Sequence, residues 1–490
     1  MRHVPPQVPR PAPPEIVVSP RLAALAAELR AGRAEALEGF WAAVTAEGTP
    51  LVEEIPGDPV HRAVTFLWRG DADDVLVMAN KLNDPSVLEA SLMERLGGTD
   101  VWHRTYRVGS AWRASYRLAP GGREGSRTDA AEDRPGPGAG AAEARPVTDV
   151  KDRTGTDAGT GTQGRTGTDA GTDAGTAGLA SSVPLGGEVA RRRDAMIAAG
   201  SRVPRAAIER WCLGLARAIA DPLNPRSWRG YSVAEMPDAP PQHALAPRRS
   251  RREPTRHVIG GRTVWRYDPA RPSAATLVLL DGEDWTGDAP VILGNLIEAG
   301  AVPPLTAFLV ESGGHRARTR DLTCDDGFVS FLADELPTGE HPPSRTAIAG
   351  QSLGGLTALY AAYRRPDRFG AAISQSGSFW WPNQSGGPGE PGGAGGPGSS
   401  GGPDPSGGSR GSHGEWLTAE LARASRVPAR CHVEVGTQEW ALLGPTRRLR
   451  DVLRAGGCDL TYREYEGGHD GACWRGSLAD GLVAVFRGTS

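Results

Sequence analysis

The stretch RTAIAGQSLGGLTALYAAY, residues 345–363, decides the fold of the second half of this chain. Residues 345–349 form a short, strand-like run, and residues 356–363 have the composition of a helix. Between them, residues 350–354 fit the pattern Gly-X-Ser-X-Gly. Glycines two positions before and after a serine let the backbones of a strand and a helix approach at a sharp turn, which exposes the serine. We therefore predict that Ser352 is a nucleophile and not simply a serine that caps a helix.

The same pattern occurs twice more, at residues 398–402 and 407–411. Both lie in a stretch, residues 382–414, that is almost entirely Gly, Pro and Ser. Such a composition cannot bury enough apolar surface to pack, so we expect a disordered surface loop there. The pattern at Ser352 alone has a strand before it and a helix after it.

Apolar runs and helical stretches alternate on both sides of Ser352. Continuous apolar runs are typical of strands that are buried on both faces of a parallel sheet. Such runs occupy residues 276–280 and 306–310. Further strands are predicted at residues 431–436 and 460–465, and helical patterns occupy residues 291–298 and 446–455. The alternation predicts an α/β-hydrolase domain with a doubly wound, mostly parallel sheet over residues 255–490.

A serine nucleophile needs a base and an acid, which in this fold follow it along the chain. His469 comes directly after the last predicted strand, between glycines, and is our predicted base. Glu439 follows the preceding strand and is our predicted acid. Glu434, inside that strand, is the first alternative, and Asp451, on a helix, is expected to face solvent.

Hydrolysis of an ester also needs backbone N–H groups that bind the oxyanion of the tetrahedral intermediate. We predict the N–H of Leu353, which follows the nucleophile, and that of Gly282, in the turn at residues 280–285. These residues indicate a serine esterase or acyltransferase.

The first half of the chain has a different texture. A helical pattern at residues 21–41 precedes short, turn-separated β-like runs, which predict a β-sandwich. The runs lie at residues 63–68, 75–78, 101–108 and 111–117. We assign residues 15–120 and 185–240 to this N-terminal domain, with a helix at residues 189–218 and a linker at residues 237–254. It is interrupted at residues 121–180 by a low-complexity insertion with a 12-residue repeat (153–160 and 165–172), which we expect to be disordered.

Composition excludes several classes of protein. The net charge of −3 over 490 residues argues against a nucleic-acid binder, and no apolar run is long enough to span a membrane. The N-terminus does not match a secretory signal, and the five cysteines form no CxxC pair, so we expect a cytoplasmic protein. Cys458, His469 and Cys473 match no zinc-site spacing, so we expect no bound metal.

With these residues in place, the chain resembles the enterochelin (enterobactin) esterase family. The motifs that carry the resemblance in the second half are residues 279–282, 318–324, 350–355 and 467–476. Those in the first half are residues 98–102, 112–116 and 221–228. The block GGHDGACWRG, residues 467–476, is the most specific of them.

The resemblance implies a cytoplasmic hydrolase of ferric siderophores, whose substrate is a ferric tris-catecholate on a cyclic ester backbone. Iron then arrives with the substrate, with no resident cofactor, nucleic acid or membrane partner; these patterns give no oligomeric state. A trianionic substrate calls for cations, which nominates Arg318, Arg320 and Arg475, together with Trp474 of the same block. Strand tryptophans such as Trp68, Trp102, Trp112 and Trp228 could stack on catechol rings. The alternatives are a general carboxylesterase or acyltransferase for an uncharged substrate, and an inactive siderophore-binding protein.

Overall fold

The computed structural model describes residues 6, 8, 10–121, 187–198, 203–247, 251–382 and 414–488. These residues belong to one contact unit, made of residues 1–121 and 185–490. The 12-residue repeat lies outside the described residues. So do the two predicted insertions, except for residues 121, 382 and 414 at their ends.

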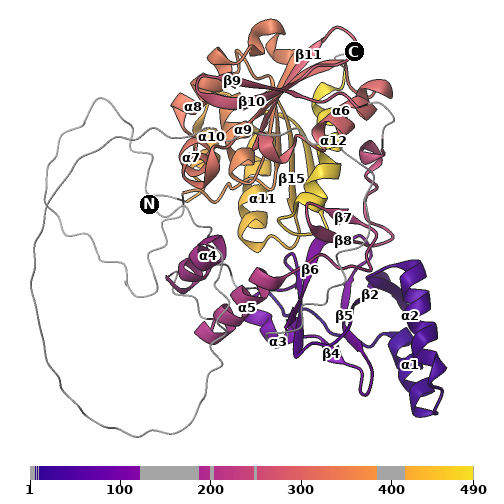
Figure 1. Cartoon of the computed structure of the whole chain (residues 1–490). Helices are drawn as coiled ribbons and strands as arrows, with labels where there is room; N and C mark the ends of the chain where they lie inside the picture. The colour runs from indigo at the N-terminus through magenta and orange to yellow at the C-terminus, as the bar shows by residue number, and fades with distance from the viewer. Residues whose placement is uncertain are drawn as a thin grey trace, which may run out of the picture. The chain divides into compact units, whose positions relative to one another are not determined.

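Residues 255–465 contribute one eight-stranded sheet in the order β16-β15-β14-β13-β11-β12-β10-β9 (Figure 1). Its strands are β9 (Thr255–Ile259), β10 (Arg262–Tyr267), β11 (Ala275–Leu280), β12 (Leu305–Val310), β13 (Thr346–Gln351), β14 (Ala371–Gln375), β15 (Arg430–Gly436) and β16 (Asp459–Tyr465). The strands from β12 to β16 and β11 pair in parallel, whereas β9 and β10 are antiparallel. The prediction of an α/β fold is confirmed.

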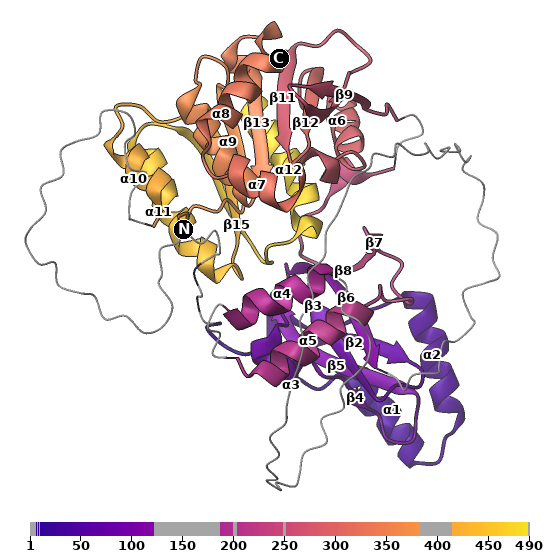
Figure 2. The ribbon, with the colours of Figure 1, turned by 60° about the vertical axis from the view of Figure 1, so that its left-hand side comes forward.

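Alternate side chains of the central strands enter two separate cores, because successive residues point to opposite faces. Val278 and Leu280 of β11 pack with the helices on one face, and Leu277 and Leu279 with those on the other. The first face carries α8 (Asp326–Ser330), α9 (Leu353–Arg364), α10 (Trp416–Arg423) and α11 (Trp440–Ala455); the second carries α6 (Ala289–Glu298) and α12 (Gly471–Phe486). Figure 2 shows α9 beside β13. A further helix, α7 (Gly314–Asp321), follows β12.

Of the eight strands of this sheet, β9, β10 and β14 were not predicted from the sequence. Strand β14 reads Ala-Ala-Ile-Ser-Gln, in which Ile373 is the one large apolar side chain. Its two neighbours, β13 and β15, supply the pairing that holds it in the sheet. Tertiary pairing, not intrinsic preference, makes this segment a strand.

The N-terminal region contains two four-stranded antiparallel sheets, in the orders β1-β2-β5-β4 and β3-β6-β8-β7. Their strands are β1 (Leu51–Ile55), β2 (Asp58–Arg69), β3 (Asp74–Ala79), β4 (Glu94–Arg95), β5 (Val101–Gly109), β6 (Arg113–Gly121), β7 (Ser227–Trp228) and β8 (Tyr231–Glu235). The two sheets share one apolar core, to which β2 contributes Phe66 and β6 contributes Tyr116. These two rings meet edge to face, with centroids 4.7 Å apart.

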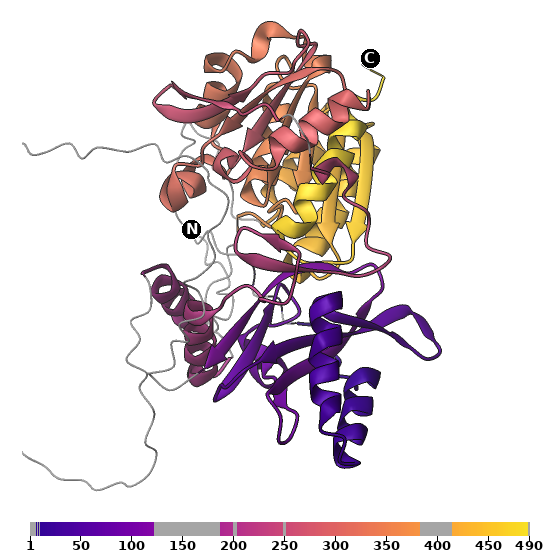
Figure 3. The ribbon, with the colours of Figure 1, turned by 45° about the vertical axis from the view of Figure 1, so that its right-hand side comes forward.

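Each long helix predicted in this region is in fact a pair. Residues 21–41 divide into α1 (Pro20–Arg30) and α2 (Glu35–Glu47), which pack side by side (Figure 3). Gly32, with φ of +79°, lies between them, in a conformation that ends a right-handed helix. Residues 189–218 contain α4 (Gly187–Ala198) and α5 (Arg205–Arg217), and the short α3 (Leu88–Ser91) completes the set.

Candidate active site

Four polar side chains follow four adjacent parallel strands. Ser352 follows β13, Ser376 follows β14, Glu439 lies three residues beyond β15, and His469 lies four residues beyond β16. The carboxyl ends of adjacent parallel strands share one edge of a sheet, and ligands of open α/β sheets bind at that edge. The topology therefore brings together four residues that are spread over a span of 118 positions in the sequence, residues 352–469.

The turn at Ser352 has the geometry of a nucleophile elbow. Its φ of +59° and ψ of −120° lie outside the regions that non-glycine residues favour. A Cβ atom on Gly350 would lie 2.4 Å from the carbonyl carbon of Gly354, so the first glycine is required for the strand and helix to approach. The strained backbone is held by a hydrogen bond from the Ser352 N–H to the Gln375 carbonyl, 3.1 Å.

Glu439 and His469 are in direct contact. Oε2 of the carboxylate lies 2.6 Å from Nδ1 of the imidazole, and the Glu439 side chain is buried. Its other oxygen, Oε1, accepts hydrogen bonds from the Gly436 N–H at 2.7 Å, the Ser376 hydroxyl at 2.6 Å and the Tyr465 hydroxyl at 3.2 Å. Burial by itself would raise the pKa of Glu439, but the imidazole and the hydrogen bonds from Ser376 and Gly436 lower the pKa by more, and the net shift is downward.

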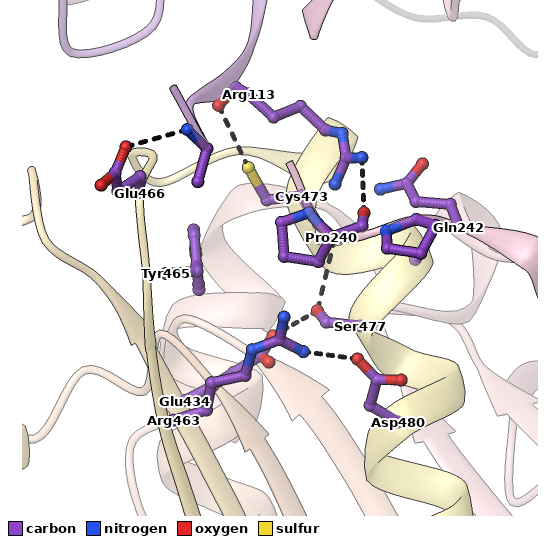
Figure 4. Close-up of a pocket in the computed structure, with 13 residues that line it drawn as sticks. Arg113, Pro240, Gln242, Glu434, Arg463, Tyr465, Glu466, Cys473, Ser477 and Asp480 are labelled. Atoms are coloured by element: carbon purple, nitrogen blue, oxygen red, sulfur yellow. Dashed lines mark hydrogen bonds and ion pairs between the residues drawn. The ribbon is translucent and has the colours of Figure 1, made fainter. Parts of the chain in front are cut away.

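The two alternative acids lie elsewhere. Glu434 is buried among Gln375, Ser477 and His432: its Oε1 accepts a hydrogen bond from Gln375 at 2.8 Å, and its Oε2 lies 3.4 Å from His432 Nε2. It also lines a small pocket with Ser477 and Arg463, which Figure 4 shows. Asp451, on α11, pairs with its neighbour Arg450 and faces solvent. The structure thus places Glu439, and neither alternative, against His469.

The hydroxyl of Ser352 lies 3.4 Å from that of Ser378. The backbone carbonyl of Ser352 also accepts a hydrogen bond from the Ser378 N–H, at 2.9 Å. Both contacts hold Ser352 beside Ser378.

The predicted oxyanion turn lies against the start of α9. Asp281 adopts the left-handed conformation, with φ of +55°, and a Cβ atom on Gly354 would lie 3.2 Å from its carboxylate. A Cβ atom on Gly282 would lie 2.3 Å from the carbonyl carbon of Leu309, so this position accepts only glycine. Leu353 is the first residue of α9, where N–H groups have no acceptor within the helix.

The three nominated arginines have different surroundings. Arg318 donates two hydrogen bonds, at 2.7 and 2.8 Å, to the carboxylate of Asp281, in the predicted oxyanion turn. Arg320 pairs with Asp321 at 2.7 Å and is largely exposed. Arg475 has no ion pair among the described residues; its Nε is buried without a hydrogen-bond partner there, and its guanidinium lies 5.9 Å from the ring centroid of Trp228.

Trp474 packs against the predicted base. Its indole meets the His469 ring edge to face, with centroids 4.7 Å apart. Its Nε1–H donates to the Ser376 hydroxyl at 2.9 Å and to the Tyr465 hydroxyl at 3.1 Å. Ser376, which links this indole to Glu439, escaped the sequence analysis; the signal was a serine at the end of a strand, and strand β14 was itself missed.

Within the described residues, no group of three or more His, Cys, Asp or Glu side chains could hold a metal ion. Cys431, Cys458 and Cys473 form no disulfide bond among the described residues. No described helix is both long and apolar enough for a membrane span.

A parallel α/β sheet with a serine at a strained strand–helix turn defines the α/β-hydrolase class. A family model described as "Putative esterase" matches residues 264–485, and one described as "Enterochelin esterase, N-terminal" matches residues 63–160. The chain is 30% identical over 488 residues to the iron(III) enterobactin esterase of Dickeya dadantii (92% of this chain, 93% of the relative). It is 32% identical over 307 residues to that of Escherichia coli CFT073 (57% and 70%).

Among solved structures, the ferric enterobactin esterase of Salmonella typhimurium is similar, with a TM-score of 0.62 and 25% identity over 92% of this chain and 98% of the other. The chain therefore belongs to the enterochelin esterase family, and it is an ester hydrolase. The family predicted from the motifs is confirmed.

Proposed function

We propose that this chain hydrolyses the ester bonds of a ferric catecholate siderophore of the enterobactin type, with Ser352 as nucleophile, His469 as base and Glu439 as the carboxylate that orients the base. The observation that carries the proposal is the 2.6 Å contact between Glu439 and His469 at the strand edge that also bears the Ser352 elbow. The names of the relatives supply the substrate class.

The reaction follows from the proton positions that the site allows. Ser352 Oγ attacks the ester carbonyl while Nε2 of His469 takes its proton, and Glu439 stabilises the imidazolium through Nδ1–H. The N–H groups of Leu353 and Gly282 receive the oxyanion. His469 then gives its proton to the leaving alkoxide of the siderophore, which leaves an acyl group on Ser352. Water, deprotonated by the same imidazole, releases the acid and restores the serine.

Arg475 is our candidate for contact with the anionic catecholates. A cation with a buried, unsatisfied Nε is costly to keep inside a protein unless a ligand engages it. It adjoins Trp228, whose ring lies so close to Gly471 that a Cβ atom there would be 2.0 Å away, two residues from His469. A guanidinium and an indole near Gly471, in the segment that also carries the base, would suit an anionic aromatic group.

Iron enters with the substrate and leaves after the ester platform opens. We further propose that the two N-terminal sheets pack as a β-sandwich, which their shared core supports. We also propose that the protein acts in the cytoplasm, which the odd number and wide spacing of its five cysteines support.

The test is a chromatographic assay with ferric enterobactin, iron-free enterobactin and p-nitrophenyl acetate. We expect linear dihydroxybenzoylserine products, absent for Ser352→Ala. Arg475→Gln should raise KM for the ferric substrate at least about tenfold, the cost of a charged hydrogen bond, and leave the KM for p-nitrophenyl acetate unchanged. Arg463→Gln, whose side chain pairs with Asp480, is the matched control. Turnover of p-nitrophenyl acetate alone would refute the siderophore assignment, and no turnover of any substrate would refute the esterase.

A further inference from the structure

The loop that carries His469, residues 466–471, is short and rich in glycine. Three of its six residues are glycines (467, 468 and 471), so its unrestrained backbone would adopt many conformations. A general base must be held within a few tenths of an ångström of its working position. The restraint on this loop must therefore come from outside it.

The N-terminal sheet that contains β3 and β6 supplies that restraint at the first half of the loop. The Arg113 N–H, at the start of β6, donates to the Glu466 carbonyl at 3.2 Å, and Arg113 forms a parallel bridge with Gly467. Its carbonyl in turn accepts from the Cys473 thiol, a contact that Figure 4 shows. The first residues of the loop, just beyond the end of β16, are therefore paired with the start of β6.

Two further contacts fix the peptide groups on either side of the base. The Asn80 side chain, just after β3, donates through Nδ2 to the carbonyl of His469 itself, at 2.9 Å. The Ser115 N–H of β6 donates to Oδ2 of Asp470 at 2.6 Å, and the other carboxylate oxygen caps α12 through the Ala472 N–H at 2.9 Å. Burial raises the pKa of Asp470.

Asn80 is the side chain whose position is hardest to explain by stability alone. Its Oδ1 is buried and has no hydrogen-bond partner in the described part of the chain, which costs free energy. The backbone N–H of Asn80 donates a hydrogen bond to the Ser115 carbonyl at 3.0 Å, which fixes the backbone of Asn80 against β6. The sheet also reaches the acid: the Trp112 indole donates to Gln438, the neighbour of Glu439, at 3.2 Å.

We propose that Asn80 is a positioning residue for the base, through which the N-terminal sheet that contains β3 and β6 sets the orientation of His469. The inference rests on the proposed role of His469. Asn80 acts by fixing the carbonyl of the residue that bears the imidazole, and it touches no reacting atom.

The test compares Asn80→Ala and the isosteric Asn80→Asp with the unmodified chain. The readouts are the rate of Ser352 labelling by a small fluorophosphonate, and kcat and KM for p-nitrophenyl acetate. We expect labelling and kcat to fall about 3- to 10-fold, the loss of one net hydrogen bond, with KM within about twofold. Asn295→Ala, which removes hydrogen bonds to the Ala244 and Ala246 carbonyls, is the matched control and should match the unmodified chain.

A double variant separates positioning from a general loss of stability. If Asn80 acts through His469, Asn80→Ala should slow labelling by less than about twofold when His469→Ala is already present. An equal slowing in both backgrounds, unchanged labelling in both Asn80 variants, or a change in KM alone would overturn the inference. If His469→Ala itself labels as fast as the unmodified chain, the proposed base is wrong, which is a separate failure.

Discussion

The substitution Glu439→Gln tests how the site sets the protonation of its base. Glutamine has the shape of glutamate, but its two polar atoms differ: one accepts and the other donates. Oε1 of Glu439 accepts from three donors: Gly436, Ser376 and Tyr465. The carbonyl oxygen of the glutamine will therefore take the Oε1 position, and its NH₂ group will face Nδ1 of His469.

The consequence is a reversed tautomer of the imidazole. Facing an N–H donor, Nδ1 must accept, so the neutral ring carries its proton on Nε2, where it cannot receive the proton of Ser352. The carboxylate that would stabilise the imidazolium, now 2.6 Å away, is also lost. A reversal of this kind costs about 10,000-fold in kcat, which is about 5 kcal/mol.

The assay is hydrolysis of p-nitrophenyl acetate and of ferric enterobactin from pH 5 to 10, with thermal unfolding in parallel. We expect kcat to fall between about 1,000- and 10,000-fold for both substrates while the protein stays folded. The matched control is Glu434→Gln, a buried carboxylate of the same strand region that contacts Gln375 and Ser477 instead; it should change kcat less than about tenfold. Folded Glu439→Gln enzyme with more than a tenth of the original kcat would refute the tautomer argument.

Three further predictions concern the frame of the site. Gly350→Ala places a Cβ atom 2.4 Å from Gly354, so denaturant titration should show that the free energy of unfolding falls by about 1–3 kcal/mol or more. The control is Gly444→Ala, inside a helix, where the Cβ atom would lie 3.5 Å from its nearest neighbour; it should not destabilise the fold. Arg318→Ala removes the hydrogen bonds to Asp281 at the predicted oxyanion turn and should lower kcat for charged and uncharged esters alike by about tenfold. Arg320→Ala, the control, should leave kcat for both kinds of ester within about twofold. If Arg318→Ala lowered activity toward the charged ester alone, a role for Arg318 at the oxyanion turn would be refuted. Because the pKa of Glu439 is lowered in the folded chain, its ionised form stabilises the fold at pH values above 4.5, the ordinary pKa of a glutamate. This contribution is lost as the pH falls below 4.5. The difference in free energy of unfolding between the unmodified chain and Glu439→Gln, measured by urea titration, should therefore narrow below pH 4.5.

The sequence was sufficient for those parts of the molecule that depend on local pattern. Strands β11 and β12 are almost continuous apolar runs, and the Ser352 turn has glycines where the backbones of a strand and a helix must touch. Each of these features can be recognised within a few residues. The order of nucleophile, acid and base along the chain made Glu439 and His469 candidates before any distance was known.

Other parts depend on partners far away in the chain. Strand β14 has one large apolar side chain and becomes a strand because β13 and β15 pair with it, which puts Ser376 beside Glu439. Glu439, and not Glu434, contacts His469 because the loop that follows β15 and the loop that follows β16 meet at the edge of the sheet. Arg318 looked like a ligand for an anion, and the fold gives it Asp281 instead. Hydrogen bonds such as that from Asn80 to His469, 389 positions apart, leave no local trace, because a side chain's preference for its own backbone says nothing about which distant carbonyl it will meet.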